Sequence, residues 1–244
     1  MNRLSCLLFI LLIAAEGFAQ EKKGFAVVEL FTSEGCSSCP AADKILSEIS
    51  TETKRGNQEV FFLTYHVDYW NKLGWKDPFS KFQFTRRQEN YSRVLPSKEL
   101  YTPQLIVNGT TEMIGSKKEK IQNTINLALK SKSQLHLDLK LDSMVGDTAF
   151  ISWKLSNQDK NFVLQLALCQ NGIVNKVNKG ENAGKTLSHD HVVRAFSAVN
   201  NPGSSGQVKF LVKDKDPGLK SEIIGFIQHK QNYSIKAAGR IPLL

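Results

Sequence analysis

The segment Cys36-Ser37-Ser38-Cys39-Pro40 constrains this chain more than any other. It follows an apolar, strand-like run at residues 25–31 and leads into apolar residues at helical spacing over residues 38–53. A helix start presents unpaired backbone N–H groups and the positive end of the helix dipole to a sulfur placed there. We therefore expect Cys36 to be an exposed, acidified thiol that attacks, and Cys39 to be the thiol that resolves the product.

Two other interpretations of this Cys-x-x-Cys spacing stay open. A zinc site usually takes a second pair of Cys or His ligands, whereas Cys169 stands alone in the remaining sequence. A purely structural disulfide over so short a loop would restrict the unfolded chain little. Cys169 lies in an apolar run at residues 162–169, and we interpret it as a buried core residue. We expect no metal ion and no cofactor.

The first 19 residues have the pattern of a secretory signal peptide. Arg3 precedes an apolar run over residues 4–15, and small residues follow, so we expect cleavage before Gln20. Cys6 would leave with this peptide. The apolar run is shorter than the roughly 20 residues that span a bilayer, and no other stretch comes close. The sequence therefore predicts a secreted or periplasmic protein without a transmembrane segment in the mature chain.

The formal net charge is +9 at pH 7. The lysine clusters are short and interrupted by acidic residues, and they are not interleaved with aromatic residues as in a nucleic-acid-binding surface. The charge favours solubility and weak attraction to anionic surfaces. We expect no nucleic-acid partner.

The hydrophobic period changes near residues 131–133. Before this point strand-like and helical runs alternate in the order β-α-β-α-β-β-α, which is typical of a thioredoxin-like domain. After it nearly every apolar run has period two, with turn signals between short strands. We predict an α/β thioredoxin-like domain at residues 24–131, followed by an all-β antiparallel sandwich domain at residues 134–244.

Local signals place the elements of the first half. The expected strands and helices cover residues 25–31, 38–53, 59–65, 77–94, 104–107 and 111–114, with a last helix from residue 116. Pro78 suits the first turn of its helix, and Ser116 is the expected N-cap of the last one. Asn108-Gly109 is a strong signal for a tight hairpin.

Four separated motifs resemble a family of secreted thioredoxin-like proteins catalogued as domain of unknown function 1223. The motifs are VELFTSEGCSSCPAAD at residues 28–43, HVDYW with LGWKDP at 66–78, YTPQ with VNG at 101–109, and GENAGKTL with HVVR at 180–194. The resemblance covers most of the expected mature chain. It implies a fold, and it supplies no known substrate.

Thioredoxin-like domains commonly hold a cis-proline opposite the dithiol, at the start of the third strand. Thr102-Pro103 has that place here, so we expect a cis bond and a surface that positions an incoming disulfide. Many such domains also keep a buried carboxylate on the strand that leads to the dithiol. Glu29 is a candidate for proton transfer if its side chain points inward, and a plain surface acid if it points outward.

Two further groups of residues have both a functional and a structural interpretation. The aromatic stretch at residues 65–75 either forms a binding wall beside the dithiol, with His66, Asp68 and Trp70, or packs an interface, which we favour slightly. His189 and His191 could be metal ligands on one face of a strand. Without further ligands a polar strand edge is favoured.

The leading hypothesis is a secreted or periplasmic thiol–disulfide oxidoreductase. Its partners would be protein thiols and disulfides, together with a redox partner of its own. One alternative is a non-catalytic binding or assembly module that retains Cys36–Cys39 as a structural disulfide. Another is a copper-handling protein that uses both cysteines and His66, because thiolates favour Cu(I). The residues Ser37-Ser38 do not determine the direction of electron flow.

Overall fold

The computed structural model describes residues 24–212 and 214–243. The signal peptide expected over residues 1–19 lies outside them. No helix within the described ranges has the length and apolar character needed to cross a bilayer.

From residue 24 to the end of α3, the described part of the first half contains three helices, one 3-10 turn and four strands. In chain order they are β1 (Ala26–Thr32), α1 (Cys39–Arg55), β2 (Val60–His66), η1 (Asn71–Leu73), α2 (Phe82–Ser92), β3 (Gln104–Val107), β4 (Thr111–Ile114) and α3 (Lys118–Lys130). All later elements are strands, namely β5 (Leu137–Val145), β6 (Thr148–Leu155), β7 (Phe162–Gln170), β8 (Ile173–Lys176), β9 (Thr186–His189), β10 (Val192–Asn200), β11 (Ser205–Leu211), β12 (Ser221–His229) and β13 (Ile235–Leu243).

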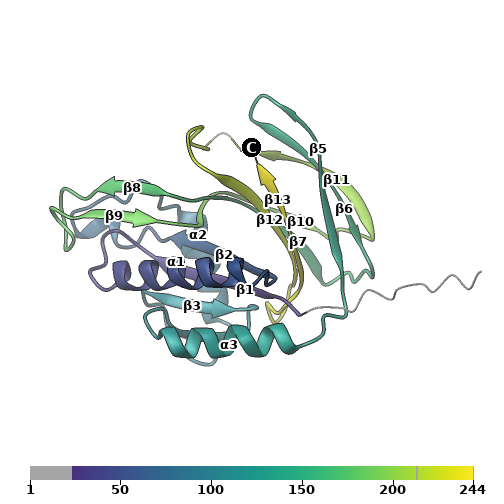
Figure 1. Cartoon of the computed structure of the whole chain (residues 1–244), viewed down its shortest axis with the longest axis horizontal. Helices are drawn as coiled ribbons and strands as arrows, with labels where there is room; N and C mark the ends of the chain where they lie inside the picture. The colour runs from purple at the N-terminus through teal and green to yellow at the C-terminus, as the bar shows by residue number, and fades with distance from the viewer. Residues whose placement is uncertain (1–23, 213, 244) are drawn as a thin grey trace, which may run out of the picture.

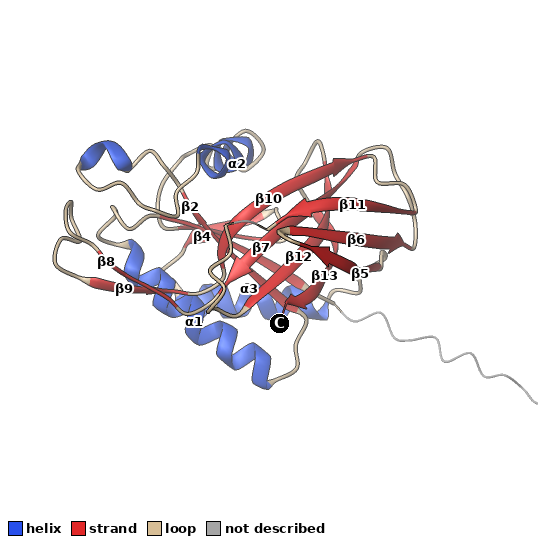
Figure 2. Ribbon diagram, turned by 90° about the horizontal axis from the view of Figure 1, so that it is seen from above, coloured by secondary structure: helices blue, strands red, loops and turns tan. Residues whose placement is uncertain are grey.

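One large mixed sheet runs through both halves of the chain, as Figures 1 and 2 show. Its eight strands have the order β13-β12-β7-β10-β2-β1-β3-β4. The halves join where β10 pairs in parallel with β2, at Val192 and Thr64. The Thr64 amide donates to the His191 carbonyl at 2.8 Å, and the Thr64 hydroxyl donates to the Asp190 carbonyl at 3.0 Å. Additional antiparallel sheets are formed by β11-β6-β5 and by β8-β9.

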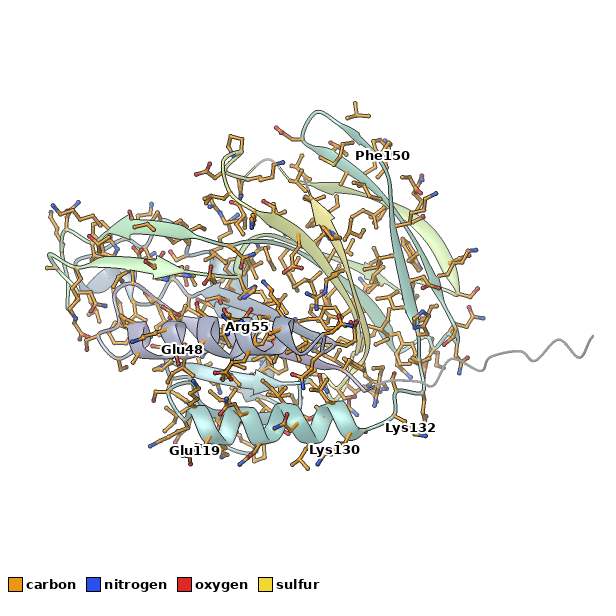
Figure 3. All side chains as sticks on the ribbon, viewed as in Figure 1. Glu48, Arg55, Glu119, Lys130, Lys132 and Phe150 are labelled. Atoms are coloured by element: carbon orange, nitrogen blue, oxygen red, sulfur yellow. A yellow bond between two sulfur atoms is a disulfide. The ribbon has the colours of Figure 1, made fainter. Side chains whose placement is uncertain are left out.

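Side-chain alternation along the strands sends apolar residues to both faces of the large sheet. On β1, Val28 and Leu30 face α1 and α3, whereas Val27 and Phe31 belong to the core that includes residues of α2. Figure 3 labels Glu48 on α1 and Glu119 on the adjacent helix α3, and the two helices are tied by an ion pair of 2.8 Å between Lys118 and Glu48.

The strands of the second half continue this division. On β7, Ala167 and Cys169 face the same core as Phe31, while Leu166 and Leu168 face the three-stranded sheet. Cys169 is a free, fully buried thiol, which confirms its interpretation as a core residue. Burial raises the pKa of this thiol well above its ordinary value. The fold is therefore a mixed α/β structure in which the two halves share a core.

Two expected helix starts are wrong. Helix α2 begins at Phe82 and not at Asp77, because the Asp77 carboxylate instead accepts hydrogen bonds from the amides of Phe79, in the turn before the helix, and of Glu34, in the dithiol loop. Helix α3 begins at Lys118, and its N-cap residue is Lys117 without a side-chain cap, so Ser116 is not the N-cap. The expected Asn108-Gly109 turn does connect β3 and β4, and both residues have positive φ.

A buried ion pair lies between α2, β1 and the second half of the chain. The carboxylate of Glu29 accepts hydrogen bonds from Arg87 at 2.6 and 2.7 Å and from the Tyr91 hydroxyl. Arg87 also donates to Gln228 on β12 at 3.2 Å. Because both charged groups are almost fully buried, each depends on the other for compensation.

We expect the substitution Arg87→Ala to lower the free energy of unfolding by about 3–5 kcal/mol, since it leaves the Glu29 carboxylate buried without its cation. Urea unfolding at pH 7 measures the change. The matched control is Arg86→Ala, which removes the exposed neighbour paired with Glu89 at 3.2 Å and should cost under about 1 kcal/mol. Equal losses in the two variants would contradict this account of the core.

Candidate functional site

The dithiol occupies the loop that joins β1 to α1. The Cys36 amide donates to the Ser33 carbonyl at 3.1 Å, and the Cys39 amide donates to the Cys36 carbonyl at 3.2 Å, so the loop is tightly turned. Cys36 and Cys39 form a disulfide with their Cα atoms 5.5 Å apart. Pro40 stands in the first helical turn, where its missing N–H removes no helical hydrogen bond.

Cys36 is buried in this disulfide form. Its residue is 1% exposed and Cys39 is 0% exposed, so the expectation of an exposed thiol at position 36 is wrong here. The Cys36 sulfur lies 3.3 Å from the Ser38 hydroxyl and 3.9 Å from the Thr102 carbonyl oxygen. Ser37 and Ser38 themselves are exposed, so solvent reaches the loop without reaching the sulfur.

The segment Thr102-Pro103 lies directly beside the dithiol. Its peptide bond is cis, as expected. The Trp70 indole N–H donates to the Thr102 hydroxyl at 2.9 Å. Gly35 lets the dithiol loop approach the same tryptophan, because a Cβ at that position would lie 3.1 Å from Trp70 Cβ. The structure thus brings Trp70 and Thr102 together next to Cys36.

A hairpin from the second half packs on the dithiol loop. We call residues 173–189, which comprise β8, β9 and the loop between them, the cover; Figure 1 shows β8 and β9 over the end of α1 at which the helix begins. Asn182 is fully buried and its side-chain amide donates to the carbonyls of Glu34 at 2.8 Å and Cys36 at 2.9 Å. Glu181 accepts a hydrogen bond of 2.9 Å from the Ser37 amide.

His189, the last residue of the cover, lies between two buried carboxylates. Its Nε2 is 3.2 Å from Glu34 Oε1, and its Nδ1 is 3.3 Å from Asp43 Oδ2. Glu34 also accepts hydrogen bonds from Trp75 at 2.8 Å and Asn175 at 2.9 Å. Burial lowers the pKa of His189, but hydrogen bonding and charge from Asp43 and Glu34 outweigh burial and raise the pKa to about 10. His189 is therefore an imidazolium at neutral pH.

A second histidine–carboxylate pair adjoins the first. His66 Nδ1 is 2.7 Å from Asp77 Oδ2, and the His66 and His189 rings meet edge to face with centroids 5.0 Å apart. Asp77 also accepts a hydrogen bond of 2.8 Å from the Glu34 backbone amide. Burial alone would raise the pKa of Asp77, but His66 and the amides of Glu34 and Phe79 together lower it. This pair fixes the segment just before Cys36.

Several residues proposed from the sequence lie away from the dithiol or are engaged elsewhere. Glu29 points inward, but its carboxylate is bound by Arg87 on the sheet face opposite α1. The Asp68 carboxylate accepts a hydrogen bond from the Thr85 hydroxyl. His191 Nε2 is 2.7 Å from the Ser50 hydroxyl, so it does not share a site with His189. Within residues 24–212 and 214–243 no group of three or more His, Cys, Asp or Glu is arranged to hold a metal ion.

Sequence reasoning missed the residues that enclose the dithiol. They are Glu34, Asp43, Asp77, Glu181, Asn182 and His189. Five of them lie inside the four motifs quoted above, so the motifs marked the right segments without assigning these roles. The sixth, His189, was weighed as a metal ligand and interpreted as part of a polar strand edge.

The His189 contacts predict a pH-dependent contribution to stability. Because the folded-state pKa of about 10 lies above the ordinary value of 6.5, protonated His189 stabilises the fold fully below pH 6.5. This contribution falls as the pH rises from 6.5 to about 10 and is absent above it.

We expect His189→Gln to lower the free energy of unfolding by about 2 kcal/mol near pH 6, as for a lost hydrogen bond between charged groups, and by progressively less toward pH 10. Urea unfolding across this range measures the trend. His136→Gln is the control, since that exposed histidine is paired with Asp138 only at the surface. A loss for His189→Gln that stays constant or grows with pH would contradict the assignment.

Among solved structures, this chain resembles protein AGR_C_4864 from Agrobacterium tumefaciens, with 27% identity, 90% of this chain and 93% of that chain covered, and a TM-score of 0.66. Two weaker matches are a domain of the outer membrane lipoprotein Omp28 from Porphyromonas gingivalis (10% identity, 46% of this chain and 96% of that chain, TM-score 0.25) and a beta-glucosidase from Kluyveromyces marxianus (15%, 51% and 16%, TM-score 0.24).

No curated protein matches the chain. The sequence profile described as "Protein of unknown function (DUF1223)" matches residues 27–228, which include the dithiol and the whole cover. The chain belongs to this family, DUF1223.

Proposed function

We propose that this protein is a thiol–disulfide oxidoreductase that works in the periplasm or outside the cell. The observation that carries the proposal is the Cys36–Cys39 disulfide at the start of α1, with the Thr102 carbonyl 3.9 Å from the Cys36 sulfur. Export is supported by the signal-peptide pattern of residues 1–19.

The arrangement of the first half supports a thioredoxin-like assignment. Its strands have the order β2-β1-β3-β4, with β1 and β2 parallel and β3 and β4 antiparallel. Helices α1 and α3 pack on one face of these strands, and α2 packs on the other. This is the arrangement in which thioredoxin-like proteins place a dithiol at the start of their first helix.

The proposed reaction exchanges one disulfide for another. The Cys36 thiolate attacks a client disulfide, so a bond forms between Cys36 and one client sulfur while the other client sulfur leaves as a thiolate. The Cys39 thiolate then attacks Cys36, which forms the Cys36–Cys39 disulfide and releases the second client thiolate. The dithiol loses two electrons and two protons, and the client gains both. Oxidation of a client dithiol is the same sequence in reverse.

Exchange requires access to the Cys36 sulfur, which is buried in the disulfide form. The Ser38 hydroxyl and the Thr102 carbonyl contact this sulfur, and the cover contacts the backbone carbonyl of the same residue through Asn182. The cover is held on this loop by polar contacts, namely those of Glu181 and Asn182 and the buried contact of His189 with Glu34 and Asp43. Its residues are not part of the apolar cores on the two faces of β1. Its local displacement would admit a client without unfolding the sheet.

The burial of both cysteines supports a second candidate function, that of a non-catalytic binding or assembly module with a structural disulfide. Both cysteines are almost fully inaccessible, as a non-exchanging disulfide requires. The two candidates differ in whether Cys36 ever forms a bond to a partner sulfur.

We expect the variant Cys39→Ala, made together with Cys169→Ala, to capture disulfide-containing proteins from a cell-envelope extract as mixed disulfides through Cys36. Without Cys39 the mixed disulfide cannot be resolved, so the adducts should rise at least about 10-fold over the native pair on non-reducing gels. Mass spectrometry identifies the linkage. The control carries Cys36→Ala as well and should capture nothing. Equal, background capture by both variants would favour the structural disulfide.

A further inference from the structure

Glu181 places a carboxylate at the dithiol loop. Its Oε2 lies 2.9 Å from the amide nitrogen of Ser37, the residue directly after Cys36. Hydrogen bonds from Ser37 lower the pKa of Glu181 below its ordinary value, which favours the ionised form of this carboxyl group. Its neighbour Asn182 holds the same loop through the Cys36 carbonyl at 2.9 Å. Glu181 itself is exposed, and its buried neighbour Asn182 holds this part of the cover on the loop.

The Glu181 carboxylate lies where positive electrostatic potential would stabilise a Cys36 thiolate. The amides before and within the first turn of α1 would stabilise a negative Cys36 sulfur. The Glu181 carboxylate instead accepts the hydrogen bond of the Ser37 amide. It thereby places a negative charge beside the residue that follows Cys36 in the chain. A nearby negative charge disfavours the ionised form of a thiol.

Other charged groups around the loop come from three elements. Glu34 of the loop and Asp43 of α1 flank the His189 imidazolium, so their charges are partly compensated. On the cover, Lys185 carries a positive charge close to this loop, because its ammonium group lies 2.9 Å from Asn182 Oδ1. Glu181 and Lys185 therefore act on Cys36 with opposite sign.

We propose that Glu181 is a tuning residue that opposes the Cys36 thiolate and makes the cover respond to the redox state of the dithiol. In the disulfide form the sulfur is neutral, so Glu181 binds Ser37 without conflict and the cover stays closed. In the reduced form the thiolate and the Glu181 carboxylate repel each other, and by linkage the thiolate weakens the hold of the cover. The cover then opens when Cys36 is able to attack.

This inference deepens the proposed exchange reaction and rests on it for its biological consequence. A charged Glu181 destabilises the reduced, thiolate form and thus favours the disulfide. The opening of the reduced form exposes the attacking sulfur, and closure after the reaction protects the new disulfide.

The first test is a titration of the reduced protein, in which absorbance at 240 nm follows thiolate formation at Cys36. Replacement by Glu181→Gln should lower the thiol pKa by about 0.5–1 unit, the size expected for one nearby charge in water. Glu181→Lys should lower it further, and Lys185→Gln should raise it. Glu52→Gln removes the same charge from the last turn of α1, beyond a Debye length, and should leave the pKa unchanged.

The second test is amide hydrogen exchange of the wild-type chain in both redox states. The amide of Ser37, which donates to Glu181 of the cover at 2.9 Å, loses this bond when the cover opens and should exchange at least about 5-fold faster after reduction. In Glu181→Gln this difference should shrink.

An unshifted thiol pKa in Glu181→Gln, or equal exchange rates in both redox states, would overturn the inference. Neither readout needs a client or turnover, so failure of the proposed oxidoreductase activity and failure of this inference are separate results.

Discussion

The contact of His189 with Glu34 and Asp43 ties together the three parts of the molecule that form the site. Glu34 belongs to the dithiol loop, Asp43 to helix α1, and His189 to the cover. Two buried carboxylates so close together would be costly without a cation between them. The imidazolium supplies that cation, and the cover is thereby docked on the loop that carries Cys36. The enclosure of the dithiol follows from this arrangement.

The continuous sheet explains why the second half of the chain can reach the first so closely. Strand β10 pairs with β2, and the residues just before it, including His189, are delivered to the start of α1. The core shared by Phe31, Ala167 and Phe226 crosses the same boundary. The dithiol site is thus composite, and the second half is part of it rather than a separate attachment.

Local patterns in the sequence predicted most elements of the first half, the Cys36–Cys39 pair and the position of Thr102-Pro103 beside it. These features depend on periodicity and on neighbours in the chain. The Cys36 carbonyl is bound by Asn182, which lies 146 positions away, and no local pattern carries that information. The partner of Glu29 was hidden for the same reason, since Arg87 reaches it from α2 and is itself bonded to Gln228 of β12. The joining of β2 to β10 was equally invisible to a period-based analysis.

The central claim is that Cys36–Cys39 is an exchanging disulfide within the folded protein. Equilibration with glutathione redox buffers of graded potential, followed by rapid alkylation and mass spectrometry, measures it directly. The account predicts a reversible two-electron transition in which Cys36 and Cys39 gain and lose their alkyl labels together while circular dichroism stays native. A disulfide that remains unlabelled under every buffer until the protein is unfolded would contradict the claim.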